Sequence, residues 1–202
     1  MSHGEHYFTA SPASPAELRT IDVRLAGRDV RITTASGVFS GDHLDHATRL
    51  LLDVVPPPPA TGDLLDLGCG WGPVALTLAH AAPQARVWAI DVNERALDLT
   101  RRNATADGAD NVTAARPEEV PDEVRFAAIW SNPPIRIGKP AVHEMLRRWL
   151  PRLTPEGAAH LVVSKNLGAD SLARWIEQEL GQPTERVTSA GGFRVLRVTH
   201  AS

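Results

Sequence analysis

The chain has 202 residues, of which 43% are hydrophobic and 22% are charged, the composition of an ordinary globular domain. No run approaches the roughly eighteen consecutive apolar residues of a membrane span, and residues 1–15 lack the basic start and apolar centre of a signal peptide. The net charge of −3 argues against indiscriminate nucleic-acid binding, although residues 131–202 carry ten basic and only six acidic side chains. The single cysteine, Cys69, excludes an internal disulfide, so we expect one cytoplasmic domain, residues 1–202.

Residues 1–60 are expected to form a small extension ahead of the main domain. Segments 20–25 and 29–34 alternate apolar and polar side chains around a short connection, which predicts a β-hairpin. Asp42 is then predicted to cap a helix that includes Leu44 and ends before the prolines at 56–59.

Acidic and histidine side chains gather at the start of this helix: Asp42, His43, Asp45 and His46. These residue types bind metals, but no further ligand is evident and helix capping accounts for Asp42. We therefore expect no metal site.

The stretch LLDLGCGWG, residues 64–72, combines a buried strand with a glycine-rich turn. Pro73 suits the first position of the helix that follows. An unpaired carboxylate inside the apolar run would be costly, so Asp66 is expected to have a partner or a function. A tight turn alone does not need three alternating glycines. Glycine also lets a ligand approach the backbone closely. We expect a ligand at this turn.

A second buried strand, residues 86–90, ends at Asp91, about twenty residues after the glycines. In doubly wound sheets a carboxylate at this place binds the ribose of a cofactor. Dinucleotide-binding folds use G-x-G-x-x-G, whereas this chain has G-x-G-x-G preceded by an aspartate. The D-x-G-C-G-x-G stretch resembles the first motif of class I methyltransferases. The resemblance implies S-adenosylmethionine as cofactor and implies that it contacts Asp66, Gly68, Cys69, Gly70, Gly72, Asp91 and Val92.

Strands and helices alternate along residues 61–202, which indicates an α/β core. We expect strands at 64–66, 86–90, 111–115, 126–130 and 158–164, and helices at 73–82, 93–107, 139–150 and 169–180. Two further strands flank Gly191 and Gly192. The prediction is a Rossmann-like, seven-stranded methyltransferase sheet, mostly parallel with an antiparallel C-terminal hairpin and helices on both faces.

Asn132, Pro133 and Pro134 follow the fourth strand of the core. They resemble the N-P-P-[YF] motif of amino-methyltransferases, which act on exocyclic base amines or glutamine amides. Such amines attack poorly, because conjugation delocalises their lone pair. The Asn132 oxygen and the Pro133 carbonyl could each accept one amine N–H, and the prolines offer no competing donor. The motif therefore predicts catalytic roles for Asn132, Pro133 and Pro134, with Asn132 also beside the cofactor.

Further segments resemble the catalytic half of ribosomal RNA small-subunit guanine-N2 methyltransferases: 6–8, 36–40, 44–45 and 192–195. The resemblance implies methyl transfer to a guanine amine of RNA, with Phe39 and Ser40 near the cofactor or target. Two positions depart from the family pattern. Ile135 replaces an aromatic residue, so Arg136 could stack on the base instead. After the third strand of the core, the chain lacks the family's usual acidic residue for the adenine amine, so Glu118 or a backbone group would bind that amine.

The basic final third suggests how RNA could bind. Arg136 and Lys139 are predicted to contact it, together with Phe39, Ser40 and Ile135. Further basic residues are expected beside the strand ends: Arg147, Arg148, Arg152, Arg194 and Arg197. The alternatives are a protein glutamine-amide methyltransferase, a small-molecule amine methyltransferase and a non-catalytic cofactor-binding module.

Overall fold

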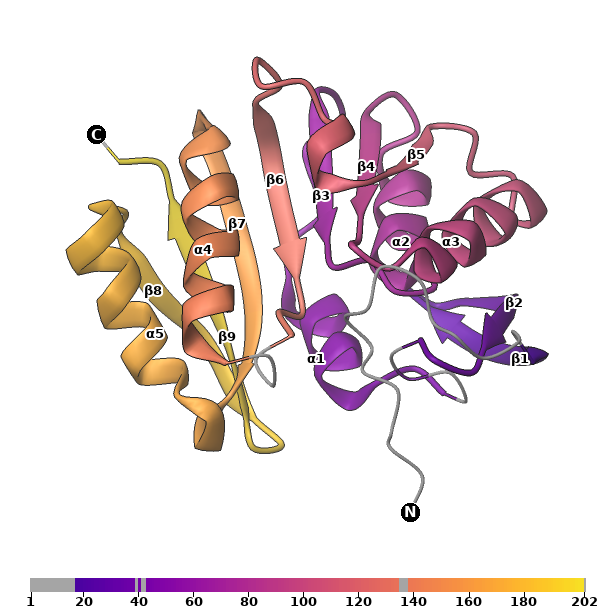
Figure 1. The fold of residues 1–202 in the computed structure, drawn as a ribbon, viewed down its shortest axis with the longest axis horizontal. Helices are drawn as coiled ribbons and strands as arrows, with labels where there is room; N and C mark the ends of the chain where they lie inside the picture. The colour runs from indigo at the N-terminus through magenta and orange to yellow at the C-terminus, as the bar shows by residue number, and fades with distance from the viewer. Residues whose placement is uncertain (1–16, 39, 41–42, 135–137, 202) are drawn as a thin grey trace.

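The core of the molecule is a seven-stranded sheet with the order β5-β4-β3-β6-β7-β9-β8 (Figure 1). The computed structural model describes residues 17–38, 40, 43–134 and 138–201. The five neighbouring strands β5, β4, β3, β6 and β7 pair in parallel, and β9 is antiparallel to both β7 and β8. The predicted methyltransferase sheet is confirmed. Its strands are β3 (Asp63–Leu67), β4 (Arg86–Ile90), β5 (Val112–Ala115), β6 (Phe126–Ser131), β7 (Leu153–Ser164), β8 (Thr184–Ala190) and β9 (Phe193–Thr199).

Helices cover both faces of the sheet because its central strands are apolar on both sides. In β3, Leu64 packs on one face and Leu65 on the other, and neither side chain is exposed. The first face is covered by α1 (His46–Val54), α2 (Pro73–Ala81) and α3 (Glu94–Ala106). The second is covered by α4 (Lys139–Trp149) and α5 (Ala169–Trp175), the latter continuing as a π-helical turn at Ile176–Leu180.

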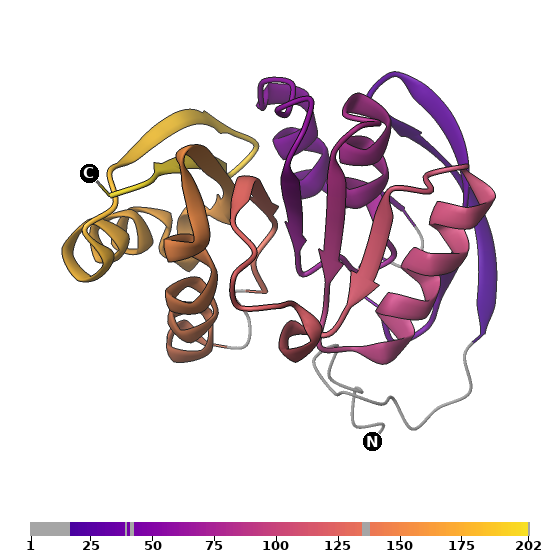
Figure 2. The ribbon, with the colours of Figure 1, turned by 90° about the horizontal axis from the view of Figure 1, so that it is seen from above.

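The N-terminal extension forms a separate two-stranded sheet from β1 (Leu18–Leu25) and β2 (Arg28–Ala35). Its inner side chains, Val23 and Leu25 among them, are buried as the alternation predicts. Figure 2 shows this hairpin beside α3, at the end of the molecule opposite the C-terminal strands. The hairpin therefore extends the core on the side of the glycine turn.

Asn103 of α3 joins this hairpin to the core. Its amide group accepts a hydrogen bond from the Thr33 N–H (2.8 Å) and donates to the Thr33 and Trp71 carbonyls (2.9 Å each). The side chain is 1% exposed. One buried amide thus connects β2, α3 and the turn after β3, so the extension and the turn hold fixed positions relative to each other.

Helix α1 begins later than predicted. Asp45 caps it by accepting the Thr48 N–H (3.0 Å), and Leu44 precedes the helix instead of belonging to it. Asp42, the predicted cap, lies outside the described residues. Both aspartates suit a helix start locally, but the cap of α1 is Asp45, which also contacts Asn132 just after β6.

Strand β7 begins five residues before the predicted 158, because Leu153 already pairs with Phe126 ahead of a register shift. Arg152 is buried just before it and donates to the carbonyls of Val124 and Pro121. No helix in the described part of the chain is long and apolar enough to cross a membrane.

Candidate active site

The glycine turn between β3 and α2 wraps around the end of β4. The N–H groups of Gly68 and Cys69 both donate to the Ile90 carbonyl, at 2.8 and 2.9 Å. Gly70 has φ of 57°, and a side chain there, as at Gly68, would meet no atom within 4 Å. Gly72 differs, because a Cβ at that position would lie 3.0 Å from the Thr100 hydroxyl oxygen. Gly68 and Gly70 therefore border open space, while Gly72 is needed for packing.

Asp66 stabilises the start of α2 from within β3. Its carboxylate is 2% exposed and accepts the Ala75 N–H at 2.9 Å. Burial, with a smaller contribution from the nearby charge of Asp91, raises the pKa of Asp66 to about 8. The carboxyl group therefore ionises reluctantly in the folded protein, and a cation beside it would favour its charged form.

Asp91 joins the turn to α3. One oxygen accepts the Gly70 N–H (3.0 Å) and the other accepts the Asn93 N–H (2.9 Å). Burial raises the pKa of Asp91 as well. The next residue, Val92, is 46% exposed, which is unusual for a large apolar side chain at the end of a buried strand. A carboxylate and an apolar surface thus stand together at this edge.

Cys69 lies within the turn and is 2% exposed. The Thr100 hydroxyl donates to its sulfur at 3.5 Å. Burial raises the pKa of the Cys69 thiol well above its ordinary value, so the thiol stays protonated and is no nucleophile.

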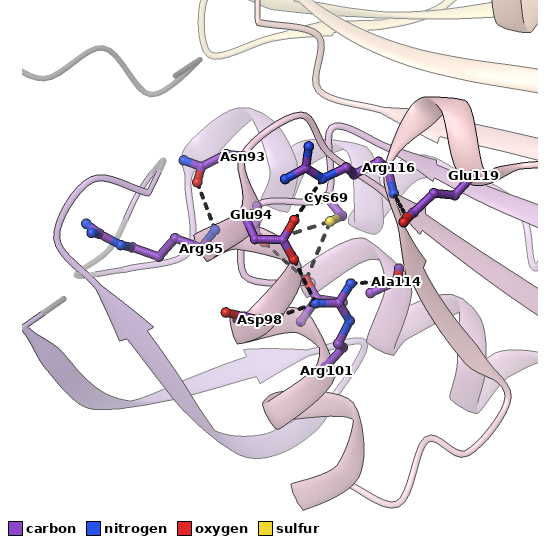
Figure 3. Close-up of polar contacts among 11 residues, drawn as sticks. Cys69, Asn93, Glu94, Arg95, Asp98, Arg101, Ala114, Arg116 and Glu119 are labelled. Atoms are coloured by element: carbon purple, nitrogen blue, oxygen red, sulfur yellow. Dashed lines mark hydrogen bonds and ion pairs between the residues drawn. The ribbon is translucent and has the colours of Figure 1, made fainter. Parts of the chain in front are cut away.

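An ion-pair network lies beyond Asp91, near the end of β5 (Figure 3). Glu94 accepts from Arg116 (2.9 Å) and from Arg101 (3.2 Å), and Arg116 holds the pKa of Glu94 below its usual range. The Arg116 N–H donates to the Glu119 carboxylate at 2.6 Å. Glu118, the predicted acidic residue for the adenine amine, is exposed at this edge. Its role stays a prediction.

Asn132 follows β6 and faces α1. Its Nδ2 atom donates to Asp45 Oδ2 (2.9 Å) and to Thr48 Oγ1 (3.0 Å). The preceding Ser131 hydroxyl donates to the Leu67 carbonyl at 2.6 Å, which ties the end of β6 to β3. Pro133 is buried and Pro134 is half-buried.

One pocket brings together Asn132, Asp66 and the glycine turn. Its wall is completed by the N-terminal extension, where the Ser40 carbonyl accepts from the Trp71 indole N–H at 3.1 Å. The residues that line it are Ser40, Leu44, Asp45, Thr48, Asp66, Gly68, Cys69, Gly70, Trp71, Pro73, Val74 and Asn132.

Several predicted site residues stand apart from this lining. Asp91, Val92 and Glu118 lie along the same edge of the sheet, towards β5. Lys139 is exposed at the start of α4. Phe39, Ile135 and Arg136 lie outside the described residues.

The sequence interpretation missed Asp45 and Thr48 as pocket residues. Asp45 belongs to the acidic and histidine cluster and to the segment 44–45, but its spacing with Thr48 is that of an ordinary helix start and did not point to this pocket. The described residues contain no group of three histidine, cysteine or acidic side chains arranged to hold a metal ion.

The sheet order and the turn after its central strand define the class of the protein: it has the class I fold of S-adenosylmethionine-dependent methyltransferases. Residues 29–197 match the family model of the methyltransferase small domain, and the chain belongs to this family. S-adenosylmethionine is the methyl donor of these enzymes.

Two curated relatives are similar to this chain over most of its length. YbxB of Bacillus subtilis, an uncharacterized protein, is 35% identical over 196 residues, which cover 96% of this chain and 97% of that protein. Ribosomal RNA small subunit methyltransferase C of Pseudomonas aeruginosa is 32% identical over 194 residues, which cover 92% of this chain. The match covers 56% of that enzyme, so the chain spans about half the length of such relatives.

A solved structure has the same architecture. It is the T. thermophilus 16S rRNA N2 G1207 methyltransferase RsmC in complex with AdoMet and guanosine. The TM-score is 0.78 with 25% identity, and the match covers 94% of this chain and 52% of that one. The chain is therefore similar to one half of this enzyme.

Proposed function

We propose that this protein transfers a methyl group from S-adenosylmethionine to the exocyclic N2 amine of a guanine in ribosomal RNA. The observation that carries the proposal is the shared pocket: Asn132, at the head of an Asn-Pro-Pro segment, lines the same cavity as Asp66 and the glycine turn. The proposed amine acceptor Asn132 and the proposed cofactor contacts at the turn therefore line one pocket.

The residues around the turn fit the cofactor. Gly68 and Gly70 border open space, which lets its methionine part lie against the backbone. The buried Asp66 carboxyl complements a ligand with cationic groups. Asp91 would accept the ribose hydroxyls, because each of its oxygens keeps a further lone pair. Val92 would pack its exposed side chain on the adenine, with Glu118 near the adenine amine.

Asn132 and Pro133 would hold the target amine. When bound, S-adenosylmethionine supplies a methyl group on a positively charged sulfur. The Asn132 side-chain oxygen and the Pro133 carbonyl would accept the two amine N–H groups and direct its lone pair at the methyl. Pro134 would stiffen the segment, and orientation of the two reactants would lower the barrier.

Guanine in ribosomal RNA is proposed from the relatives. The T. thermophilus structure is named for N2 methylation of a 16S rRNA guanine, and that structure contains guanosine. Phe39, Ser40, Ile135, Arg136 and Lys139 are the residues proposed to contact the RNA. An RNA substrate of this kind implies the cytoplasmic location expected from the sequence. Residues 1–60 and 61–202 would act as one domain, because both line the pocket.

The test is methyl transfer from labelled S-adenosylmethionine to small ribosomal subunits, to naked ribosomal RNA and to total cell protein. We expect label in RNA and N2-methylguanosine after nucleoside digestion, with none from Asn132→Ala. Label in protein or in a small amine would contradict the RNA assignment. Absence of transfer to every acceptor, together with intact cofactor binding, would indicate a non-catalytic module.

A further inference from the structure

We propose that Asp45 and Thr48 of α1 are positioning residues that orient the Asn132 amide for methyl transfer. They would fix its Nδ2 atom against α1 and leave its Oδ1 atom to receive the target amine. The proposal rests on the proposed function, because it assigns a role within the same reaction.

The orientation of the amide follows from its partners. A carboxylate can only accept hydrogen bonds, so the Asn132 atom 2.9 Å from Asp45 Oδ2 must be the donor nitrogen. The Thr48 hydroxyl oxygen lies 3.0 Å from the same nitrogen. Two acceptors thus match the two N–H groups of Nδ2. Among the described residues, Asn132 has hydrogen bonds through Nδ2 and none through Oδ1, and Asn132 lines the pocket.

A rotated amide would be unsuitable for the reaction. It would turn N–H groups towards the N–H groups of the incoming amine and set Oδ1 against the Asp45 carboxylate. Both contacts would be repulsive, and the hydrogen bond to Asp45 would be lost, whereas the Thr48 hydroxyl could donate to either orientation. The pair on α1 therefore selects the acceptor orientation before any substrate binds, which is preorganisation of the site.

Helix α1 is a rigid support for this pair. The Asp45 oxygen that holds Asn132 also accepts the Thr48 N–H, so the cap of the helix fixes its position. Thr48 is 5% exposed, and Leu51 in the next turn is fully buried. The support comes from the N-terminal extension, 87 residues away along the chain from Asn132.

Two variants separate this role from helix capping. Asp45→Ser keeps a side-chain oxygen that caps the helix but is too short to reach Asn132. Thr48→Val keeps the shape of the side chain and removes the acceptor. Asp53→Ser, at an exposed position on the same helix, is the matched control.

We expect Asp45→Ser and Thr48→Val each to lower kcat by about ten- to a hundredfold, since small misplacements of reacting groups are costly. The affinity for S-adenosylmethionine and the melting temperature should stay close to wild type. Asp45→Asn should keep most of the wild-type kcat. The Thr48 N–H would orient the new amide so that its oxygen, like the carboxylate oxygen of Asp45, accepts from Asn132. In the Asn132→Ala background, Asp45→Ser should have no further effect.

Unchanged kcat in both variants, or a full additional loss in the Asn132→Ala background, would overturn the proposal. A second measurement does not depend on the substrate. In ¹H–¹⁵N spectra, the Asn132 side-chain NH₂ signals, assigned from their loss in Asn132→Ala, should shift in Asp45→Ser and not in Asp53→Ser. If the wild type methylates another amine, the RNA assignment fails while these readouts still decide the role of Asp45 and Thr48.

Discussion

Asp66 and Asp91 place two carboxyl groups beside one glycine turn, with little water to solvate either. Asp66 accepts one backbone N–H and Asp91 accepts two, and burial raises both pKa values. In a protein without ligand, this arrangement lowers stability at high pH. A cationic cofactor would relieve the cost, so the electrostatics that weaken the free protein favour binding.

The first prediction concerns stability and pH. The pKa of Asp66 is higher in the folded protein, about 8, than in the unfolded chain, so the folded state holds the proton more tightly. The resulting stability is fully present below the unfolded pKa and is lost as the pH rises towards 8. Asp66→Asn stays neutral and removes this loss. In urea unfolding without cofactor, the free energy of unfolding of the variant relative to wild type should therefore increase between about pH 5 and about pH 9. The account would be contradicted if the difference in unfolding free energy between Asp66→Asn and wild type stayed constant across that range and equalled that of the exposed control Asp53→Asn.

The second prediction concerns cofactor binding. Asp91→Ala removes the acceptor proposed for the ribose hydroxyls. Hydrogen bonds to a charged group contribute about 1.5–3 kcal/mol, so affinity for S-adenosylmethionine should fall by roughly ten- to a hundredfold. Titration calorimetry measures it, with the exposed Asp110→Ala as control. Equal affinities for Asp91→Ala and wild type would place the cofactor elsewhere.

At the scale of elements, the N-terminal extension is part of the site. The hairpin is fixed by Asn103, and Asp45 and Thr48 at the start of α1 contact Asn132 just after β6. A further pair of contacts strengthens the link: Asn93 and Arg95 at the start of α3 donate to the carbonyls of Gly37 and Ser36. The extension therefore holds one wall of the pocket against the turn that forms the other.

The third prediction tests this link. Asn103→Ala removes three hydrogen bonds and leaves the Thr33 N–H without its partner. The free energy of unfolding should fall by about 2–4 kcal/mol, because buried unsatisfied polar groups are costly. Urea unfolding measures the change. Arg102→Ala, exposed at the preceding position of α3, should lie within about 0.5 kcal/mol of wild type. A similarly small change in Asn103→Ala would mean that the hairpin is held by other contacts.

At the scale of the whole molecule, five basic side chains of the final third contact other parts of the fold. Arg147 pairs with Glu179 and lies over Trp175. Arg148 donates to the Pro117 carbonyl, and Arg152 is buried before β7. Arg194 and Arg197 form ion pairs with Asp170 and Glu185. Each of these five side chains thus has a partner within the fold, and their place beside the strand ends where substrate would enter stays a prediction.

The fourth prediction follows from that distribution. Arg136 and Lys139 follow the Asn-Pro-Pro segment and remain the residues proposed to contact RNA phosphates. The double variant Arg136→Ala, Lys139→Ala should reduce the slope of log affinity against log salt by about 0.7 for each lost contact to single-stranded RNA. Arg147→Ala should leave the slope unchanged. A slope equal to wild type in the double variant would remove both residues from the RNA footprint.

Most of the sequence predictions came from local motifs. The glycine turn, Asp91 and Asn132 each follow a strand, and parallel strands bring their carboxyl ends to one edge, so their grouping could be inferred. The contact of Asn132 with Asp45 could not, because it joins residues 87 positions apart and neither sequence pattern requires the other. The start of α1 was misplaced because two aspartates suit a helix cap locally, and in the structure Asp45 is the cap.

Loss of the Asn132 acceptor tests the central claim most directly, because it should separate chemistry from cofactor binding. Asn132→Ala removes a side chain that lines the pocket but leaves the glycine turn and Asp91 in place. We predict that kcat with ribosomal RNA falls at least about a hundredfold, while calorimetry finds an affinity for S-adenosylmethionine within about twofold of wild type. A variant that methylates at the wild-type rate, or that loses the cofactor together with activity, would contradict the account.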